Sequence, residues 1–154
     1  MAEITAKRGL FFEEFNVGDT VTSQGRTITE ADIVAFAALS GDWNPIHTDA
    51  EHAKQGMFGE RIAHGLLGLS VATGLAMQLG FITETAMAFR GLEWKFRGVI
   101  KIGDTIHMRA EVTEKKAVPR LGGGLVIFNV EVINQRGEVA QQGTWSMIVK
   151  MQGA

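Results

Sequence analysis

The chain has 154 residues, of which 45% are hydrophobic, and its 15 basic and 17 acidic side chains give a formal net charge of −2 at pH 7. This length suits one domain, residues 1–154, with a sizeable core. The sequence lacks a run of Lys and Arg that could neutralise a string of phosphates, so we do not expect a nucleic-acid partner. The sequence contains no cysteine, which excludes disulfides, thiolate metal sites and a thiol nucleophile and is compatible with a cytoplasmic location.

Neither the N-terminal residues nor the apolar stretches indicate a membrane partner. Residues 1–15 contain three glutamates and lack a long apolar core, so we expect no signal peptide. The longest apolar stretch, residues 66–81, is shorter than a membrane span and is interrupted by Ser70, Thr73 and Gln78. We therefore expect a buried helix in that stretch.

The first predicted elements are a strand at residues 21–28 and a helix that ends at about Ser40. The helix should begin at Thr29, whose hydroxyl can cap the N-terminus while Asp32, three residues later, completes a short capping box. Gly41 stands where a residue of left-handed conformation would end the helix.

The segment after this helix combines polar side chains with a proline. Pro45 restricts Asn44 to extended conformations, which prevents the helix from continuing. Asp42 and His47 are therefore predicted to lie on a turn, where both could contact one water molecule. Five residues apart on a helix, the two side chains would diverge.

A long helix is predicted from His64 onward, after a polar segment at residues 48–61. This helix is apolar on nearly all sides, as expected for an element inside a core. Its glycines, Gly65, Gly68 and Gly74, each weaken a helix by up to ~1 kcal/mol relative to alanine. The pattern thus indicates a packing or ligand reason for at least one of them.

The C-terminal half is predicted to form strands. Residues 106–113 alternate between apolar and polar side chains, and residues 126–132 and 139–149 repeat the alternation after glycine-containing turns. Together with residues 21–28 and 87–96, this makes about five antiparallel strands around one long hydrophobic helix. The combination predicts an α+β layered arrangement.

Two motifs carry a resemblance to a known family. The run FAALSGDWNPIH at residues 36–47 and the run IAHGLL at residues 62–67 resemble the MaoC-type (R)-specific enoyl-CoA hydratases. Residues 96–105 are similar to a later strand and turn of that family, with Val99 in place of the usual proline. The resemblance covers most of the chain.

The resemblance implies a hot-dog fold, in which a curved antiparallel sheet wraps a central helix and two subunits form a homodimer with acyl-CoA sites near the interface. It places the catalytic aspartate and histidine on Asp42 and His47, with Asn44 as a supporting residue. Gly65 falls on the glycine whose backbone N–H faces the thioester oxygen. By ungapped spacing, Thr73 falls on a hydroxyl residue that supports the aspartate.

The chemistry of hydration explains why these residue types are needed. Adding water to a conjugated thioester requires a base for the attacking water, an acid for Cα and stabilisation of the enolate-like oxygen. A carboxylate and an imidazole can carry the two proton transfers. Gly65 at a helix start offers an N–H without an intrahelical partner, at the positive end of the helix dipole.

Each candidate residue also has a purely structural interpretation. Asp42 could simply cap the turn before Asn44. His64 could cap the helix or contact substrate, and for this residue we favour a structural or supporting role over direct contact with substrate. Arg90, Lys95 and Arg97 could hold CoA phosphates, although such residues usually form a solvated face.

The histidine spacing matches no zinc pattern, and we expect no metal and no cofactor apart from the coenzyme A of the substrate. Three functional classes remain open. The first is a hydratase that also works in reverse as a dehydratase, on CoA or acyl-carrier-protein thioesters. The second is a hot-dog thioesterase, against which the pair Asp42 and His47 argues. The third is a non-catalytic acyl-binding or regulatory module.

Overall fold

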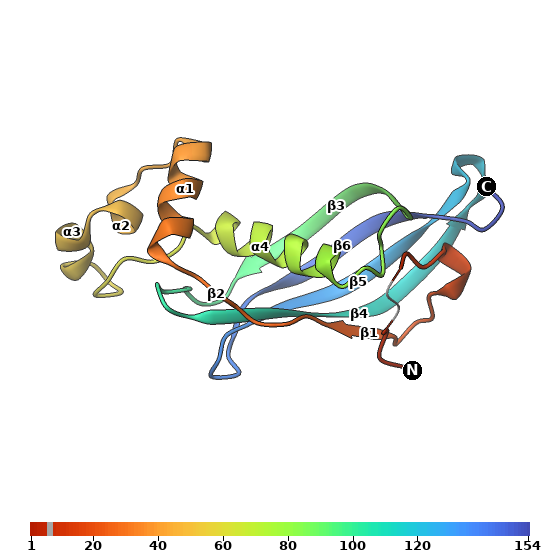
Figure 1. The fold of residues 1–154 in the computed structure, drawn as a ribbon, viewed down its shortest axis with the longest axis horizontal. Helices are drawn as coiled ribbons and strands as arrows, with labels where there is room; N and C mark the ends of the chain where they lie inside the picture. The colour runs from red at the N-terminus through yellow and green to blue at the C-terminus, as the bar shows by residue number, and fades with distance from the viewer. Residues whose placement is uncertain (6–7) are drawn as a thin grey trace.

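The structure is a computed structural model that describes residues 1–5 and 8–154. One long helix lies in the concave face of an antiparallel sheet of six strands (Figure 1). The sheet order is β1-β4-β5-β6-β3, with β2 also paired to β4. The strands are β1 (Thr20–Thr22), β2 (Arg26–Thr27), β3 (Ala86–Phe96), β4 (Thr105–Val118), β5 (Gly123–Ile133) and β6 (Val139–Lys150).

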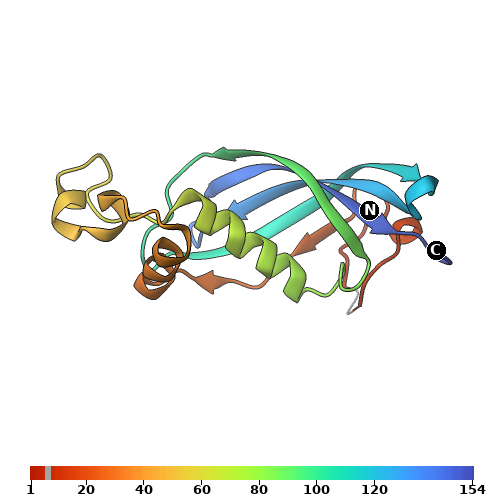
Figure 2. The same ribbon diagram turned by 90° about the horizontal axis from the view of Figure 1, so that it is seen from above.

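The long helix is α4, and three shorter helices gather at one end of the sheet, away from the two chain termini (Figure 1). Seen from above, α4 crosses the sheet while β3 arches over its side (Figure 2). The helices are α1 (Glu30–Ser40), α2 (Pro45–Thr48), α3 (Ala50–Lys54) and α4 (Gly65–Gln78), and the 3-10 turns are η1 (Phe12–Glu14) and η2 (Pro119–Leu121). The predicted α+β arrangement is confirmed.

The predicted strand at residues 21–28 is instead divided into β1 and β2, which both pair with β4. The interruption falls at Ser23, whose N–H donates to the Met108 carbonyl while its hydroxyl oxygen accepts the Met108 N–H at 2.9 Å. The Ser23 hydroxyl therefore takes the place of a backbone carbonyl as the acceptor in the hydrogen bonding with β4. The alternation of apolar residues cannot reveal this exchange of acceptors, because the chain stays extended on both sides of Ser23.

Strand β4 continues five residues beyond its predicted end at Thr113, to Val118. The pairing of β4 with β5 shifts register between Val112 and Glu114, and the regular alternation of buried residues stops there. Beyond the shift the strand leaves the core, so its side chains no longer need to alternate. Pairing continues as far as Val118 opposite Gly123.

Helix α1 has the predicted ends. The Thr29 hydroxyl accepts the Asp32 N–H at 3.3 Å, and the Asp32 carboxylate accepts the Thr29 N–H at 2.9 Å. Gly41 ends the helix in the left-handed region, at φ 79°, and its N–H donates to Ala37 O. A residue with a Cβ would be strained in this conformation.

The prediction that His47 lies on a turn is wrong, because residues 45–48 form α2. Pro45 is the first residue of that helix, where its fixed φ is suitable and its missing N–H has no intrahelical partner to lose. Asn44 caps the helix by accepting the Ile46 N–H at 3.2 Å. The polar segment at residues 48–61 likewise contains α3, which Asp49 caps.

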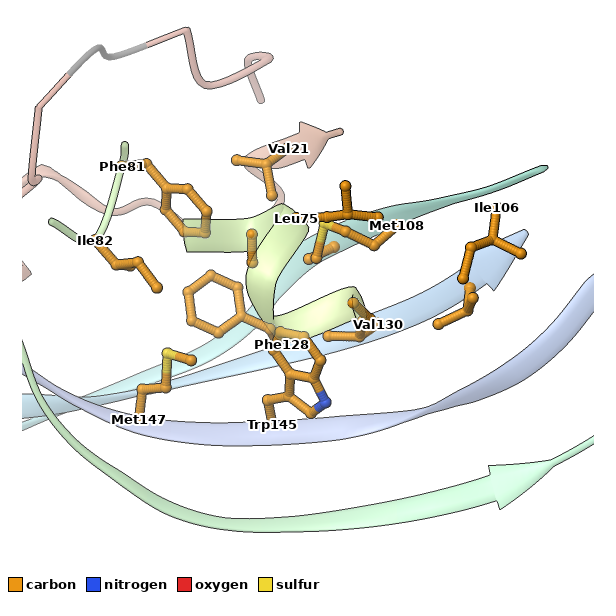
Figure 3. Packing of buried hydrophobic residues seen from close by; sticks show 14 of the residues in the cluster. Val21, Leu75, Phe81, Ile82, Ile106, Met108, Phe128, Val130, Trp145 and Met147 are labelled. Atoms are coloured by element: carbon orange, nitrogen blue, oxygen red, sulfur yellow. The ribbon is translucent and has the colours of Figure 1, made fainter. Parts of the chain in front are cut away.

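The core lies between α4 and the concave face of the sheet. Leu75 of α4 meets Met108, Phe128 and Trp145 from three different strands (Figure 3). Phe128 also packs edge-on against Phe81, with ring centroids 6.1 Å apart. Each large side chain buried in this way contributes about 1.5–3 kcal/mol, so the contact holds α4 firmly against the sheet.

Within the described ranges, no helix has both the length and the apolar character that crossing a membrane would require.

Candidate active site

Three side chains converge near the N-terminus of α4. Asp42 lies between α1 and α2, His47 lies in α2, and His64 immediately precedes α4. One ligand atom from each of the three lies within 4.8 Å of the other two. One water molecule can bridge groups at this separation, since each hydrogen bond spans about 3 Å. The structure thus brings together the predicted pair, Asp42 and His47, and adds His64.

Asp42 combines the structural and the chemical interpretations. Its Oδ1 accepts the N–H of Asn44 at 3.2 Å, which is the turn-capping contact, and its own N–H donates to Ser40 Oγ at 3.1 Å. Within residues 1–5 and 8–154, Oδ2 accepts no hydrogen bond. One carboxylate oxygen therefore fixes the turn and the other is free to exchange a proton.

The imidazole of His47 is buried, with 6% of its residue surface exposed, and one of its nitrogens is engaged. Nδ1 lies 2.7 Å from the carbonyl oxygen of Ile62. Because a carbonyl only accepts, Nδ1 carries the proton and the neutral ring keeps a lone pair on Nε2. The backbone contact thereby selects Nε2 of His47 as the atom that can accept a proton.

His64 is buried more deeply, at 3% exposure, and contacts both members of the pair. Its Nε2 donates to the backbone carbonyl of Asp42 at 2.9 Å. Its ring stacks on that of His47, with ring centroids 3.8 Å apart and planes inclined by 26°. The ring of Phe36 also packs against the His64 ring, with centroids 4.9 Å apart. Nδ1 of His64 is buried and has no hydrogen-bond partner within the described residues.

The three groups are of metal-binding type, but the stacking geometry does not favour a shared ion. Imidazole lone pairs lie in the ring plane, so two nearly parallel rings direct them side by side instead of toward one point. Nδ1 of His47 and Nε2 of His64 are also already engaged with backbone carbonyls. The arrangement suits hydrogen bonding and proton transfer better than metal coordination.

Gly65 is the first residue of α4, and its N–H forms no hydrogen bond within the described part of the chain. Its carbonyl accepts Nε2 of Gln141 at 2.9 Å, and Gln141 in turn accepts the Trp94 indole N–H at 3.0 Å. These contacts anchor the helix start to β3 and β6. The free N–H at the positive helix end has the character of an oxyanion site.

Two of the three helical glycines have a packing reason. A Cβ on Gly65 would lie 2.6 Å from Cε1 of Phe96, and a Cβ on Gly68 would lie 2.4 Å from Nε2 of Gln141. At Gly74 a Cβ would meet nothing within 4 Å. The expected packing reason is thus confirmed at Gly65 and Gly68.

A cavity of about 340 Å³ adjoins His47 and Gly65. Its wall is mostly apolar and comes from α2, from Phe96 at the end of β3 and from the segment 98–100 that follows. Helix α4 contributes only Gly65 and Leu66, so the cavity does not follow the length of the helix. Asp42 is not part of the wall.

Thr73 is the predicted site residue that the structure does not bring to the others. Its hydroxyl donates to the carbonyl of Ser70 at 2.6 Å, within α4. At 1.5 Å per residue, Thr73 lies about 12 Å beyond Gly65 along the helix axis. No hydrogen bond joins Thr73 to Asp42 in the described chain, so the supporting role of Thr73 stays a prediction.

Comparisons with known proteins identify the family of the chain. Residues 14–133 match the family model described as MaoC like domain. The protein named MaoC from Klebsiella aerogenes is 42% identical over 106 residues, 68% of this chain but only 31% of that protein. An (R)-specific enoyl-CoA hydratase from Rhodospirillum rubrum is 34% identical over 113 residues, 70% of this chain and 76% of that protein.

Solved structures give the same result for the fold. A structure described as a monoamine oxidase regulatory protein from Archaeoglobus fulgius aligns with a TM-score of 0.87 and 37% identity, covering 97% of this chain and 99% of that one. A Mycobacterium tuberculosis protein described as a double hot-dog fold aligns with a TM-score of 0.82 at 20% identity, over 94% of this chain and 45% of that one. The fold is therefore the expected hot-dog fold, and the chain belongs to the family of MaoC-like domains.

Proposed function

We propose that this chain is a hydro-lyase that reversibly adds water to trans-2-enoyl-CoA and forms (R)-3-hydroxyacyl-CoA. The observation that carries the proposal is the cluster at the start of α4, where Asp42 and His47 lie within reach of one water beside the unused N–H of Gly65. The cluster offers no hydroxyl or thiol nucleophile for a covalent intermediate with the acyl group, whereas the pair suits proton transfer to and from water.

In the proposed reaction, Gly65 N–H holds the thioester oxygen while water occupies the position between Asp42 and His47. As the water oxygen bonds to Cβ, one member of the pair takes a proton and the electrons of the double bond move toward the thioester oxygen. The pair then delivers a proton to Cα, which balances the proton taken from water, so that both groups return to their starting protonation states. The free Nε2 of His47 and the free Oδ2 of Asp42 are the atoms available for these steps.

The names of the relatives support the reaction class and the stereochemistry, since the Rhodospirillum rubrum protein is named an (R)-specific enoyl-CoA hydratase. The Archaeoglobus protein is instead named as regulatory, which supports the third functional class. The free proton-transfer atoms of Asp42 and His47 favour the enzyme, because a binding module has no need to keep both available.

One assay separates the functional classes. Purified protein is mixed with crotonyl-CoA, and loss of the enoyl double bond and release of free thiol are measured on the same sample. We expect loss of the double bond without thiol release, with the (R)-3-hydroxy product in chiral analysis. Thiol release would identify a thioesterase, and no change in either signal would favour the regulatory module. Recovery of the (S) product would contradict the assigned stereochemistry.

A further inference from the structure

We propose that His64 is a positioning residue for both proton-transfer groups, an inference that rests on the function proposed above. His64 contacts neither group at the atom that would exchange a proton. It instead holds the backbone of Asp42 through Nε2 and one face of the His47 ring through stacking. A single buried side chain thereby sets the position of the carboxylate relative to the imidazole.

The unpaired nitrogen of His64 argues that more than packing selects this residue. A leucine or phenylalanine could fill the space between Phe36 and His47 without burying a nitrogen that lacks a partner. The imidazole differs from such residues in the N–H that it donates to Asp42 O at 2.9 Å. That hydrogen bond links the loop carrying Asp42 to the start of α4, where Gly65 offers its N–H.

The link matters because the other anchors of the two groups are separate. Asp42 is otherwise held by Ser40 and Asn44, its neighbours in the loop, and His47 by the carbonyl of Ile62. Without His64, the two groups could shift relative to each other, and the contact of His47 with Ile62 O would be held less firmly because the stacked ring is lost. Displacement of a reacting group by about 1 Å can lower a rate by about 10²-fold.

Three substitutions separate the two contacts. His64→Phe keeps a ring against His47 but removes the donor to Asp42, His64→Gln keeps a donor but removes the ring, and His64→Ala removes both. We expect kcat for crotonyl-CoA to fall about 10-fold or more in the first two variants and about 10²-fold in His64→Ala, with KM changed less than about 3-fold. Wild-type kcat in His64→Ala would overturn the proposal.

Combining His64→Ala with substitution of the pair provides a readout that a purely structural residue would not give. If His64 acts through the proton-transfer pair, adding His64→Ala to the variant Asp42→Asn/His47→Ala should lower the residual rate less than about 2-fold. A further fall of about 10²-fold, as large as in the wild-type background, would show that His64 acts elsewhere and would overturn the proposal.

A spectroscopic measurement keeps this test distinct from that of the function itself. Imidazole ¹⁵N shifts report the tautomer of each histidine, and the contacts predict a proton on Nδ1 of His47 and on Nε2 of His64. In His64→Ala we expect the His47 signals to move toward an average of the two tautomers as the ring loosens. Unchanged His47 shifts would contradict the positioning role even if the wild-type protein hydrated no enoyl-CoA.

Discussion

Asp42 and His47 differ in how the surrounding chain fixes them. Asp42 is exposed and is held by contacts within its own loop, whereas His47 is buried and bonds to a carbonyl from a distant segment, Ile62 O. A change at Asp42 therefore disturbs little packing. Truncation of His47 also removes the ring that His64 stacks upon.

Loss of either proton-transfer group should affect the rate and leave the fold intact. We expect Asp42→Asn and His47→Ala each to lower turnover of crotonyl-CoA by ~10²–10⁴-fold, as is typical when general acid–base catalysis is lost. Initial rates are measured beside circular dichroism spectra that establish folding. Near-normal hydration by either folded variant would remove that residue from the mechanism.

Two glycines of α4 form a matched pair for a second prediction. Gly65→Ala would force the Phe96 ring to move, since the added Cβ would lie 2.6 Å from Cε1, and should lower kcat/KM by about 10-fold or more by distorting the oxyanion site. Gly74→Ala meets nothing within 4 Å and should raise the free energy of unfolding by about 0.4–1 kcal/mol with normal activity. Equal kinetic effects of both substitutions would contradict this account of Gly65.

At the scale of elements, Asp104 joins the turn before β4 to the turn between β5 and β6. Burial opposes ionisation of its carboxyl group, but hydrogen bonds from Gln135 and from the Lys101 N–H, with the charge of Arg136, outweigh burial and lower the pKa. A lowered pKa in the folded state means that ionised Asp104 contributes stability above the unfolded pKa of about 3.9. That contribution is lost as the pH falls through the folded pKa.

The pKa shift of Asp104 predicts a pH-dependent effect of Asp104→Asn. At pH 7 we expect the variant to lose about 1–3 kcal/mol of unfolding free energy, measured by urea denaturation, because charge-assisted bonds are replaced by neutral ones. The difference from wild type should shrink as the pH is lowered below about 4, where Asp104 of the unfolded wild-type chain becomes neutral, and should vanish below the lower pKa of the folded protein. A difference that stays constant between pH 7 and pH 3 would contradict this assignment.

At the scale of the whole molecule, β3 is the least covered part of the sheet. It pairs with β6 along one edge, and no other described strand pairs with its second edge. Nearly all of its residues are exposed, including the large apolar side chains Met87, Phe89, Leu92 and Phe96. An exposed apolar edge strand invites pairing with another chain.

We therefore predict a homodimer that uses the β3 edge, in which two sheets become continuous. Light scattering at micromolar concentration should give twice the mass of the chain. Leu92→Lys should shift the protein toward monomer, whereas Leu39→Lys, at an equally apolar exposed position on α1, should not. A wild-type monomer, or equal effects of both substitutions, would contradict an interface at β3.

Local patterns were sufficient to predict most elements of the fold, whereas the resemblance to a known family singled out Asp42 and His47. The ends of α1 follow from Thr29, Asp32 and Gly41 because capping is decided within a few residues, and the strands follow from alternation because one face of each is buried. The motif at residues 42–47, which carries that resemblance, indicated the residues proposed for proton transfer, since their types and spacing are local properties as well.

Only the tertiary structure decided which distant groups meet. His64 lies far from Asp42 along the chain, and its contacts with Asp42 and His47 exist because α4 begins beside α2. The carbonyl of Ile62 selects the tautomer of His47, and the Phe96 ring explains why position 65 lacks a side chain. These relations depend on packing between segments that are separate in sequence, which no local periodicity encodes.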